Sequence, residues 1–288
     1  ADLPVGVDPD GADAWSWQDL LALDASVGAP PDRFNAAGQD WGLPPFVPDR
    51  LRAAGFEPFI QTLRAALRHA GGLRIDHVIG LFRLWLMPRG GDPAAGAYVR
   101  YPSHEMLAIL VLEAHRAGVV VVGEDLGTVQ PGDRRELRRR GILSYRLAYF
   151  ERRPPARYPR TSLAAVTTHD LPTVAGTWLG TDLDVQRRAG LAPDASGLAR
   201  LRRRLVRVAG VGADAPLKEL VLKLHHALAA SPAALVAATL EDAARAEERP
   251  NLPGTVDQHP NWSVPLPTPL EELTGDQLVK RLAAALRR

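Results

Sequence analysis

Two hydrophobic patterns alternate along this chain. Short continuous apolar runs are typical of strands buried in a parallel sheet, whereas apolar residues that recur every three to four positions are typical of amphipathic helices. The apolar runs predict strands at residues 2–7, 73–76, 119–122, 145–150, 163–168 and 233–240. The helical spacing predicts helices at residues 57–70, 103–117, 131–141, 198–209, 217–224 and, from a capping box at Thr274-x-x-Gln277, 274–288.

Segments rich in proline and glycine predict loops between these elements, because Pro and Gly at high density exclude regular structure. Ser103 is a candidate N-cap for its helix, and Gly118 is expected to end that helix. The predicted loops are residues 28–32, 38–45, 88–102, 151–160 and 251–262.

The order of strand, helix, strand, helix is that of a (β/α)₈ barrel of the TIM type, an α/β fold with its active site at the carboxyl ends of the strands. A closed barrel needs eight strands, and the patterns indicate about six. The chain begins with Ala1 and enters a strand directly, so we expect a protein whose first strands are missing. Because an incomplete barrel exposes a sheet edge, we expect these 288 residues alone to fold poorly and to be inactive.

On this view residues 1–288 form the C-terminal part of a barrel. Residues 1–50 are a polar and aromatic loop region, and residues 72–176 contain the strands that carry the acidic residues. Residues 180–230 are a helical insertion, and residues 263–288 form a C-terminal helix.

Composition narrows the class of protein. Apolar residues make up 46% of the 288 positions, enough for a sizeable core. The absence of cysteine excludes disulfides, thiolate metal sites and cysteine nucleophiles. We expect neither a membrane span nor a signal peptide, and a cytoplasmic location.

Arginine runs at 134–135, 138–140 and 202–204 raise the possibility of a nucleic-acid surface. No nucleic-acid-binding motif accompanies them, and the net charge is only +2. We therefore interpret the runs as solvated helix faces and expect no nucleic-acid partner.

Acidic residues follow three of the predicted strands. They are Asp76, Glu124 and Asp170. Arg74 lies two positions before Asp76, so both side chains point the same way on a strand. Charged residues at the end of a buried strand are costly unless they pair or take part in chemistry. Three such carboxylates suggest cleavage of a glycosidic bond.

A retaining glycosidase uses two carboxyl groups about 5–5.5 Å apart. Asp76 suits the ionised nucleophile, because Arg74 would lower its pKa. Glu124 suits the proton donor, because burial and a nearby negative charge would raise its pKa. Asp170 is a candidate for holding the ring hydroxyls of the distorted sugar, with His77 and His169 as neutral donors.

Each motif alone has a plainer interpretation. Arg74-x-Asp76 could be a buried ion pair, Gly123-Glu124 could cap a helix, and His169-Asp170 could bind a metal. The histidines and carboxylates lack the i, i+4 spacing of a zinc-binding helix, so no metal site is expected. The combination of all three motifs is far more specific than any one.

The motifs Leu73-Arg74-Ile75-Asp76-His77, Gly123-Glu124-Asp125-Leu126-Gly127 and Thr168-His169-Asp170-Leu171-Pro172 resemble the catalytic motifs of the amylomaltase, or disproportionating enzyme, family of 4-α-glucanotransferases. That family is related to the α-amylases. The resemblance extends to residues 27–32, 38–45, 251–255 and 259–262, and residues 83–85 and 96–99 resemble its bacterial maltodextrin branch.

The resemblance implies Asp76 as nucleophile, Glu124 as general acid/base and Asp170 as transition-state stabiliser. It implies that the remaining residues that bind the glucan are Arg74, His77, His169, Asp32, Gln39, Asp40, Trp41 and Asn251. A flat Trp face suits a sugar ring, and amide and carboxylate groups suit its hydroxyls.

The implied reaction moves a maltodextrin segment from one 1,4-α-glucan to glucose or another glucan, in an α-amylase-like barrel, with no cofactor. The partners would be maltooligosaccharides, and the oligomeric state is not indicated. Two alternatives stay open: an α-glucan hydrolase of the amylase clan and a non-catalytic glucan-binding fragment.

Overall fold

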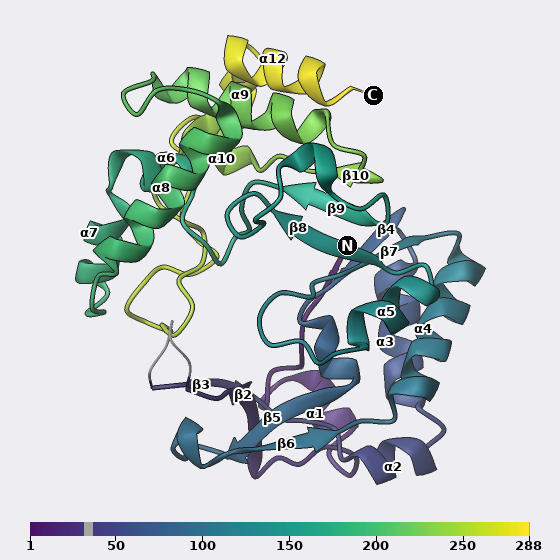
Figure 1. The fold of residues 1–288 in the computed structure, drawn as a ribbon. Coiled ribbons are helices and arrows are strands. Elements are labelled where there is room, and N and C mark those ends of the chain that lie inside the picture. Colours follow the sequence, from purple (N-terminus) through teal and green to yellow (C-terminus); the bar gives the residue numbers. More distant parts are fainter. Residues whose placement is uncertain (32–36, 288) are drawn as a thin grey trace. The chain divides into compact units, whose positions relative to one another are not determined.

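A computed structural model of the protein describes residues 1–31 and 37–287. The chain forms two compact units, Ala1–Ser144 (unit 1) and Tyr145–Arg288 (unit 2), each of which is described by itself. Figure 1 shows both units and labels most of their helices and strands.

Parallel strands form the centre of unit 1. They are β1 (Asp2–Leu3), β4 (Gly72–Ile75) and β7 (Val120–Gly123), with β4 between the other two. The first residues of β8 (Leu143–Leu147) pair with the end of β7. The hydrogen-bond ladder continues one residue past the strands, because the Asp76 amide donates to the Leu3 carbonyl and the Glu124 amide to the Ile75 carbonyl, both at 2.9 Å. Asp76 and Glu124 are therefore held by backbone at neighbouring strand ends.

Helices α3 (Glu57–Leu67) and α4 (Ser103–Ala117) bury their apolar stripes in the same core as these strands. Pro58 lies in the first turn of α3 and Gly118 ends α4 in the left-handed conformation, both as predicted. Pro102, not Ser103, is the N-cap of α4. The remaining helices of unit 1 are α1 (Ala12–Ser16), α2 (Pro48–Ala53), α5 (Asp133–Arg139) and the 3₁₀ turns η1 (Val78–Leu81) and η2 (Pro93–Ala95).

A second, antiparallel sheet in unit 1 corrects the sequence prediction. Its strand order is β3-β2-β5-β6. The segments predicted as loops at 28–32, 38–45 and 88–102 contribute strands to it, and that part of the prediction was wrong. The strands are β2 (Ala25–Ala29), β3 (Gln39–Leu43), β5 (Arg83–Pro88) and β6 (Ala97–Arg100).

Gly28 shows why glycine was misleading here. A Cβ atom on Gly28 would lie 1.9 Å from the Gln39 carbonyl oxygen and 2.5 Å from Cε of Met87. The pairing register of β2 and β3 also shifts between Val27 and Gly28. This glycine therefore allows a close approach of two strands at a bulge, and does not mark a loop.

Unit 2 contains the rest of β8 with β9 (Ser162–Ala165) and β10 (Leu235–Val236), and β9 and β10 pair in parallel. The helices pack around a core that includes Val166, Leu205, Leu224 and Leu282. Besides the turn η3 (Pro155–Arg157), they are α6 (Val174–Leu179), α7 (Asp182–Arg188), α8 (Ala195–Ala209), α9 (Leu217–Ala229), α10 (Leu240–Ala244), α11 (Leu270–Leu273) and α12 (Gln277–Leu286).

Several element ends in unit 2 differ from the prediction. Strand β9 ends at Ala165, not at 168. The predicted strand 233–240 is only two residues long, and its last predicted residues instead belong to the start of α10, which Thr239 caps. Asp276 is the N-cap of helix α12, and its carboxylate accepts from the Leu278 amide at 2.6 Å, whereas the Thr274 hydroxyl donates to the Glu271 carbonyl. The predicted capping box was therefore wrong, because the Asp276 carboxylate supplies the hydrogen-bond acceptor that Thr274 was expected to provide.

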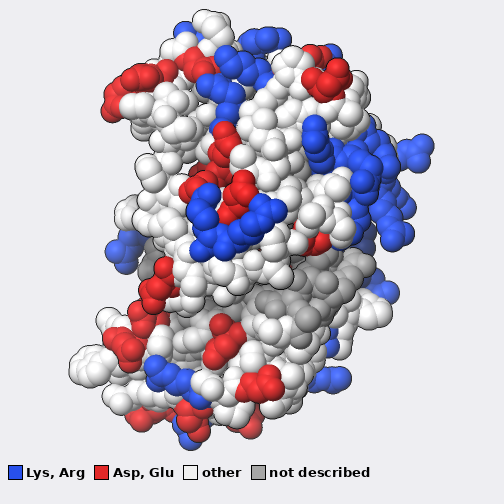
Figure 2. Space-filling view, turned by 90° about the vertical axis from the view of Figure 1, so that its left-hand side faces the viewer, with Lys and Arg blue, Asp and Glu red and all other residues white. Residues whose placement is uncertain are grey.

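The arginine runs make contacts within the protein. Arg134 donates to the buried Asp125 carboxylate at 2.7 Å, Arg140 pairs with Glu136, and Arg202 lies over the Trp178 ring. In Figure 2, acidic and basic side chains lie next to one another over much of the face, and a group of Lys and Arg side chains lies together at its right-hand edge. Among the residues that the structure describes, no helix has the length and hydrophobicity needed to cross a bilayer.

Candidate active site

Asp76 is the first residue after β4, and Arg74 holds it. Arg74 donates to Oδ1 of Asp76 at 2.6 Å and to both carboxylate oxygens of Asp2 at 2.7 and 2.8 Å. Burial opposes the charge of Arg74, but Asp76 and Asp2 outweigh it and raise the pKa of the guanidinium above its ordinary value. Asp76 thus faces a permanent positive charge that fixes its orientation.

Glu124 is the first residue after β7 and is 8% exposed. Its Oε1 accepts from the Leu126 amide at 2.6 Å and its Oε2 from the His77 amide at 3.0 Å. Burial raises the pKa of Glu124 to about 7, and the charge of Asp76 adds to the effect, while the backbone donors oppose it. This is the direction that the sequence predicted, and it leaves a proton on Glu124 in a large share of molecules near neutral pH.

His77 connects these carboxylates to β3. Its backbone is left-handed (φ 45°), and its ring contacts the Trp41 ring edge to face, with centroids 5.4 Å apart. Burial lowers the pKa of His77, while Asp76 opposes the shift, so the imidazole is neutral at pH 7. A non-glycine residue held in this conformation beside two carboxylates is typical of a functional site.

The predicted glucan-binding residues of β3 have different surroundings. Trp41 packs on His77 and donates from Nε1 to the Gln39 amide oxygen at 3.1 Å. Asp40 instead accepts from the Gly42 amide and from the buried Ser26 hydroxyl. Trp41 and Gln39 therefore contact each other, and Trp41 also contacts His77. Asp40 does not share these contacts, because its carboxylate binds Ser26 and Gly42. Asp32 lies outside the described residues.

Asp170 in unit 2 has a different kind of support. It lies five residues beyond Ala165, the end of β9. Asn251 donates to Oδ1 of Asp170 at 2.6 Å, Nε2 of His169 is 3.3 Å from Oδ2, and Arg249 donates to the Asp170 carbonyl at 3.1 Å. Asn251, predicted to touch the glucan, is here a partner of the third carboxylate.

Two residues in this cluster were not assigned from the sequence. The Trp262 ring lies 4.9 Å from that of His169 and is 66% exposed, which suits a sugar-stacking surface. The signal for it was an aromatic residue in the 259–262 motif. Arg249 pairs with Asp182, 67 positions earlier, and no sequence pattern indicated that pair.

The structure thus assembles two clusters. Unit 1 brings Arg74, Asp76, His77, Glu124 and Trp41 together, and unit 2 brings together His169, Asp170 and Asn251. The convergence of Asp76, Glu124 and Asp170 on one pocket stays a prediction. Among the described residues, no group of three or more His, Asp or Glu side chains is arranged to hold a metal ion.

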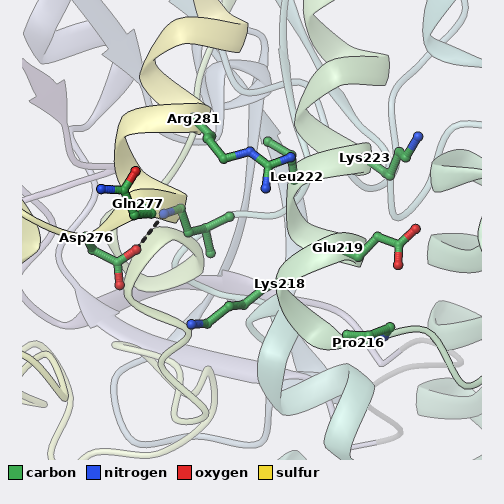
Figure 3. A pocket seen from close by; sticks show the side chains of 9 residues that line it. Pro216, Lys218, Glu219, Leu222, Lys223, Asp276, Gln277 and Arg281 are labelled. Atoms are coloured by element: carbon green, nitrogen blue, oxygen red, sulfur yellow. Dashed lines mark hydrogen bonds between the residues drawn. The ribbon is translucent and has the colours of Figure 1, made fainter.

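A groove of about 610 Å³ lies between α9 and α12 of unit 2, and its side chains are drawn in Figure 3. It contains none of the predicted site residues, and its walls carry long Lys and Arg side chains without a buried carboxylate. We assign it no role in catalysis. It is lined by Pro216, Lys218, Glu219, Leu222, Lys223, Asp276, Gln277, Leu278 and Arg281.

Comparison with known proteins shows the family of this chain. A family model described as 4-alpha-glucanotransferase matches residues 1–271. The 4-alpha-glucanotransferase of Mycobacterium tuberculosis is 45% identical over all of this chain, and that of Haemophilus influenzae is 36% identical over 97% of it. The chain spans about 43% of the length of each of these relatives.

Two solved structures resemble the protein. Amylomaltase from Corynebacterium glutamicum matches with a TM-score of 0.91 and 40% identity, over 100% of this chain and 46% of its own. Amylomaltase from Streptococcus agalactiae matches in fold, with a TM-score of 0.79 and 21% identity, over 99% of this chain and 56% of its own. These matches confirm the predicted fold class. It is an α/β fold of the TIM-barrel, α-amylase-like type, and this chain covers a part of it. The chain belongs to the 4-alpha-glucanotransferase family.

Proposed function

We propose that the protein transfers a segment of a 1,4-α-glucan to the 4-hydroxyl of glucose or of another glucan, by a retaining double displacement. The observation that carries this proposal is the pair of carboxyl groups at neighbouring strand ends. One is held by an arginine, and the other is buried with its pKa raised to about 7. A retaining mechanism needs this division into an ionised nucleophile and a protonated acid.

In the first step, an oxygen of Asp76 attacks the anomeric carbon as Glu124 gives its proton to the departing glycosidic oxygen. The bond from carbon to the leaving sugar breaks, and an ester between Asp76 and the donor segment forms. In the second step, Glu124, now ionised, takes the proton of the acceptor 4-hydroxyl as that oxygen attacks the same carbon. The ester breaks and both carboxyl groups regain their first state.

Asp170 serves the same sugar in this proposal, by holding ring hydroxyls as the ring flattens toward the oxocarbenium-like transition state. His169 and Asn251 keep its two oxygens in place. Trp41 in unit 1 and Trp262 in unit 2 each provide a flat apolar face on which a glucose unit can stack. The S. agalactiae amylomaltase was solved in complex with acarbose, and we propose a carbohydrate site of the same kind here.

The substrates in this proposal are maltooligosaccharides and longer α-glucans of maltodextrin metabolism, no cofactor is required, and the location is the cytoplasm. The lack of cysteine supports that location.

The decisive experiment is product analysis with maltotriose, in the full polypeptide that carries this sequence. Disproportionation yields glucose together with maltooligosaccharides longer than maltotriose. A hydrolase yields only shorter products, and a glucan-binding fragment yields none.

A Glu124→Gln variant tests the assigned roles. It cannot protonate a sugar leaving group, so transfer from maltotriose should fall by about 10²–10⁴-fold. The first step with α-maltosyl fluoride, followed as the initial burst of fluoride release, should be far less affected, because fluoride departs without a proton. The second step still lacks its base, so steady-state turnover should be low with both donors. A first step that is slowed equally with both donors would show that Glu124 is not the acid.

A further inference from the structure

Arg249 and Asp182 form a buried ion pair in unit 2, and Arg249 also contacts Asp170. Arg249 donates from Nε to Oδ1 of Asp182 at 2.9 Å and from Nη2 to Oδ2 at 2.6 Å. The Arg249 side chain is 8% exposed and that of Asp182 is fully buried. This two-bond geometry holds the guanidinium plane in one orientation.

The remaining guanidinium nitrogen of Arg249, Nη1, binds the backbone of Asp170. This nitrogen donates to the Asp170 carbonyl at 3.1 Å, and the backbone carbonyl of Arg249 accepts from Nε2 of His259 at 3.1 Å. Two residues later, Asn251 donates to the Asp170 carboxylate. One short segment therefore binds both the backbone and the side chain of Asp170.

Support from the 249–251 segment matters because Asp170 lies beyond the end of its strand. The residue lies in a turn beyond β9, and its amide is 3.3 Å from the Thr168 hydroxyl, a long hydrogen bond. A buried ion pair is also weak evidence for a gain in stability, because desolvation of both charges offsets their attraction. The pair is better explained by the geometry that it imposes.

We propose that Arg249 is a positioning residue for Asp170, and that Asp182 is the anchor that orients Arg249. This inference rests on the proposed function, in which Asp170 binds the reacting sugar. A displacement of Asp170 by about 1 Å should lower turnover by up to about 10²-fold.

Loss of one partner alone would leave a buried charge unpaired and could prevent folding. The test therefore replaces both, Asp182→Leu with Arg249→Met, which keeps similar volumes and removes both charges. We expect a melting temperature within a few degrees of the parent, a kcat for maltotriose disproportionation lowered by about 10–100-fold, and a smaller change in KM. Arg249→Lys is the second variant. It keeps the charge but not the fork, and should lower kcat in the same way.

The chain offers a matched control. Arg188 and Glu248 also join α7 to the segment at 248–249, but their side chains are 60% and 41% exposed. An Arg188→Ala, Glu248→Ala double variant should change neither kcat nor the melting temperature measurably.

An Asp170→Asn background separates this inference from the proposed function. If Arg249 acts through Asp170, adding the Leu and Met substitutions to Asp170→Asn should lower activity by no more than about twofold, because coupled residues are not additive. A folded double variant, or a folded Arg249→Lys variant, with the parent kcat would overturn the positioning role. Unchanged transfer by Asp170→Asn alone would instead refute the role of Asp170 in the proposed function.

Discussion

The two units place their acidic side chains by different physical means. In unit 1, Asp76 and Glu124 are the residues directly after β4 and β7, and their amides continue the ladder between the strands. In unit 2, Asp170 lies five residues past β9 and is held by Asn251 and Arg249, about 80 positions away in the chain. A strand end positions a side chain through backbone hydrogen bonds, whereas a turn needs side-chain braces from elsewhere.

This difference has a consequence for mutational sensitivity. The backbone that positions Asp76 and Glu124 is unaffected by most side-chain substitutions, so loss of activity there should come from the carboxylates and from Arg74, which orients Asp76. The position of Asp170 depends on several side chains, so substitution of any one of them should lower activity. Four predictions sharpen this comparison.

The largest effect is expected from Asp76→Asn. Without a nucleophilic carboxylate no glycosyl ester forms, so transfer should fall by at least about 10⁴-fold with maltotriose and with α-maltosyl fluoride alike. Asp170→Asn should cost less, about 10²–10³-fold, because it removes stabilisation of the transition state and no bond-forming atom. Mass spectrometry after reaction with the fluoride should detect the glycosyl ester in Asp170→Asn and not in Asp76→Asn. An ester in Asp76→Asn would refute the assignment.

An intermediate effect is expected from substitution of Asn251, which holds the Asp170 carboxylate. Asn251→Ala removes the 2.6 Å hydrogen bond to Asp170 and should lower kcat by about 10–100-fold. The matched substitution in unit 1 is Gln39→Ala, which removes a partner of Trp41 and no partner of a carboxylate. It should affect KM more than kcat. If Gln39→Ala lowered kcat as strongly as Asn251→Ala, the contrast between the units would be wrong.

The smallest effect is a pH dependence that belongs to unit 1. Glu124 must be protonated in the first step, so kcat/KM should fall about tenfold per pH unit above its pKa of about 7. The curve for α-maltosyl fluoride should lack this descending limb, because its leaving group needs no proton. A descending limb of equal position with both donors would assign it to another group.

The free energy of unfolding should also depend on pH through Glu124. The pKa of Glu124 in the folded protein is raised above its ordinary value of 4.5, so the folded state binds more protons between pH 4.5 and 7. Its contribution to the free energy of unfolding therefore decreases as pH rises through that window. Glu124→Gln should remove this slope, and its melting temperature should exceed that of the parent at pH 8 by a few degrees.

Sequence reasoning worked best where position follows from the strand. The four consecutive valines and the glycine before Glu124 predicted both the strand and the raised pKa of the carboxyl group, because burial at a strand end depends on local residues. Arg74 and Asp76 were expected to share a face from their spacing, and the 2.6 Å bond between them agrees. The small sheet of unit 1 was missed because Gly28 and Gly38–Gly42 resemble loop sequences until a partner strand is present.

The sequence by itself determined the α/β class, the strand ends that carry Asp76 and Glu124, and the family resemblance, because these depend on local pattern and on short motifs. Only the tertiary structure decided that Asn251 binds Asp170, that Arg249 pairs with Asp182, and that Trp41 rather than Asp40 meets His77. The physical reason is that these contacts join residues between 36 and 81 positions apart, and hydrogen bonding or ring packing over such separations leaves no periodic trace in the chain.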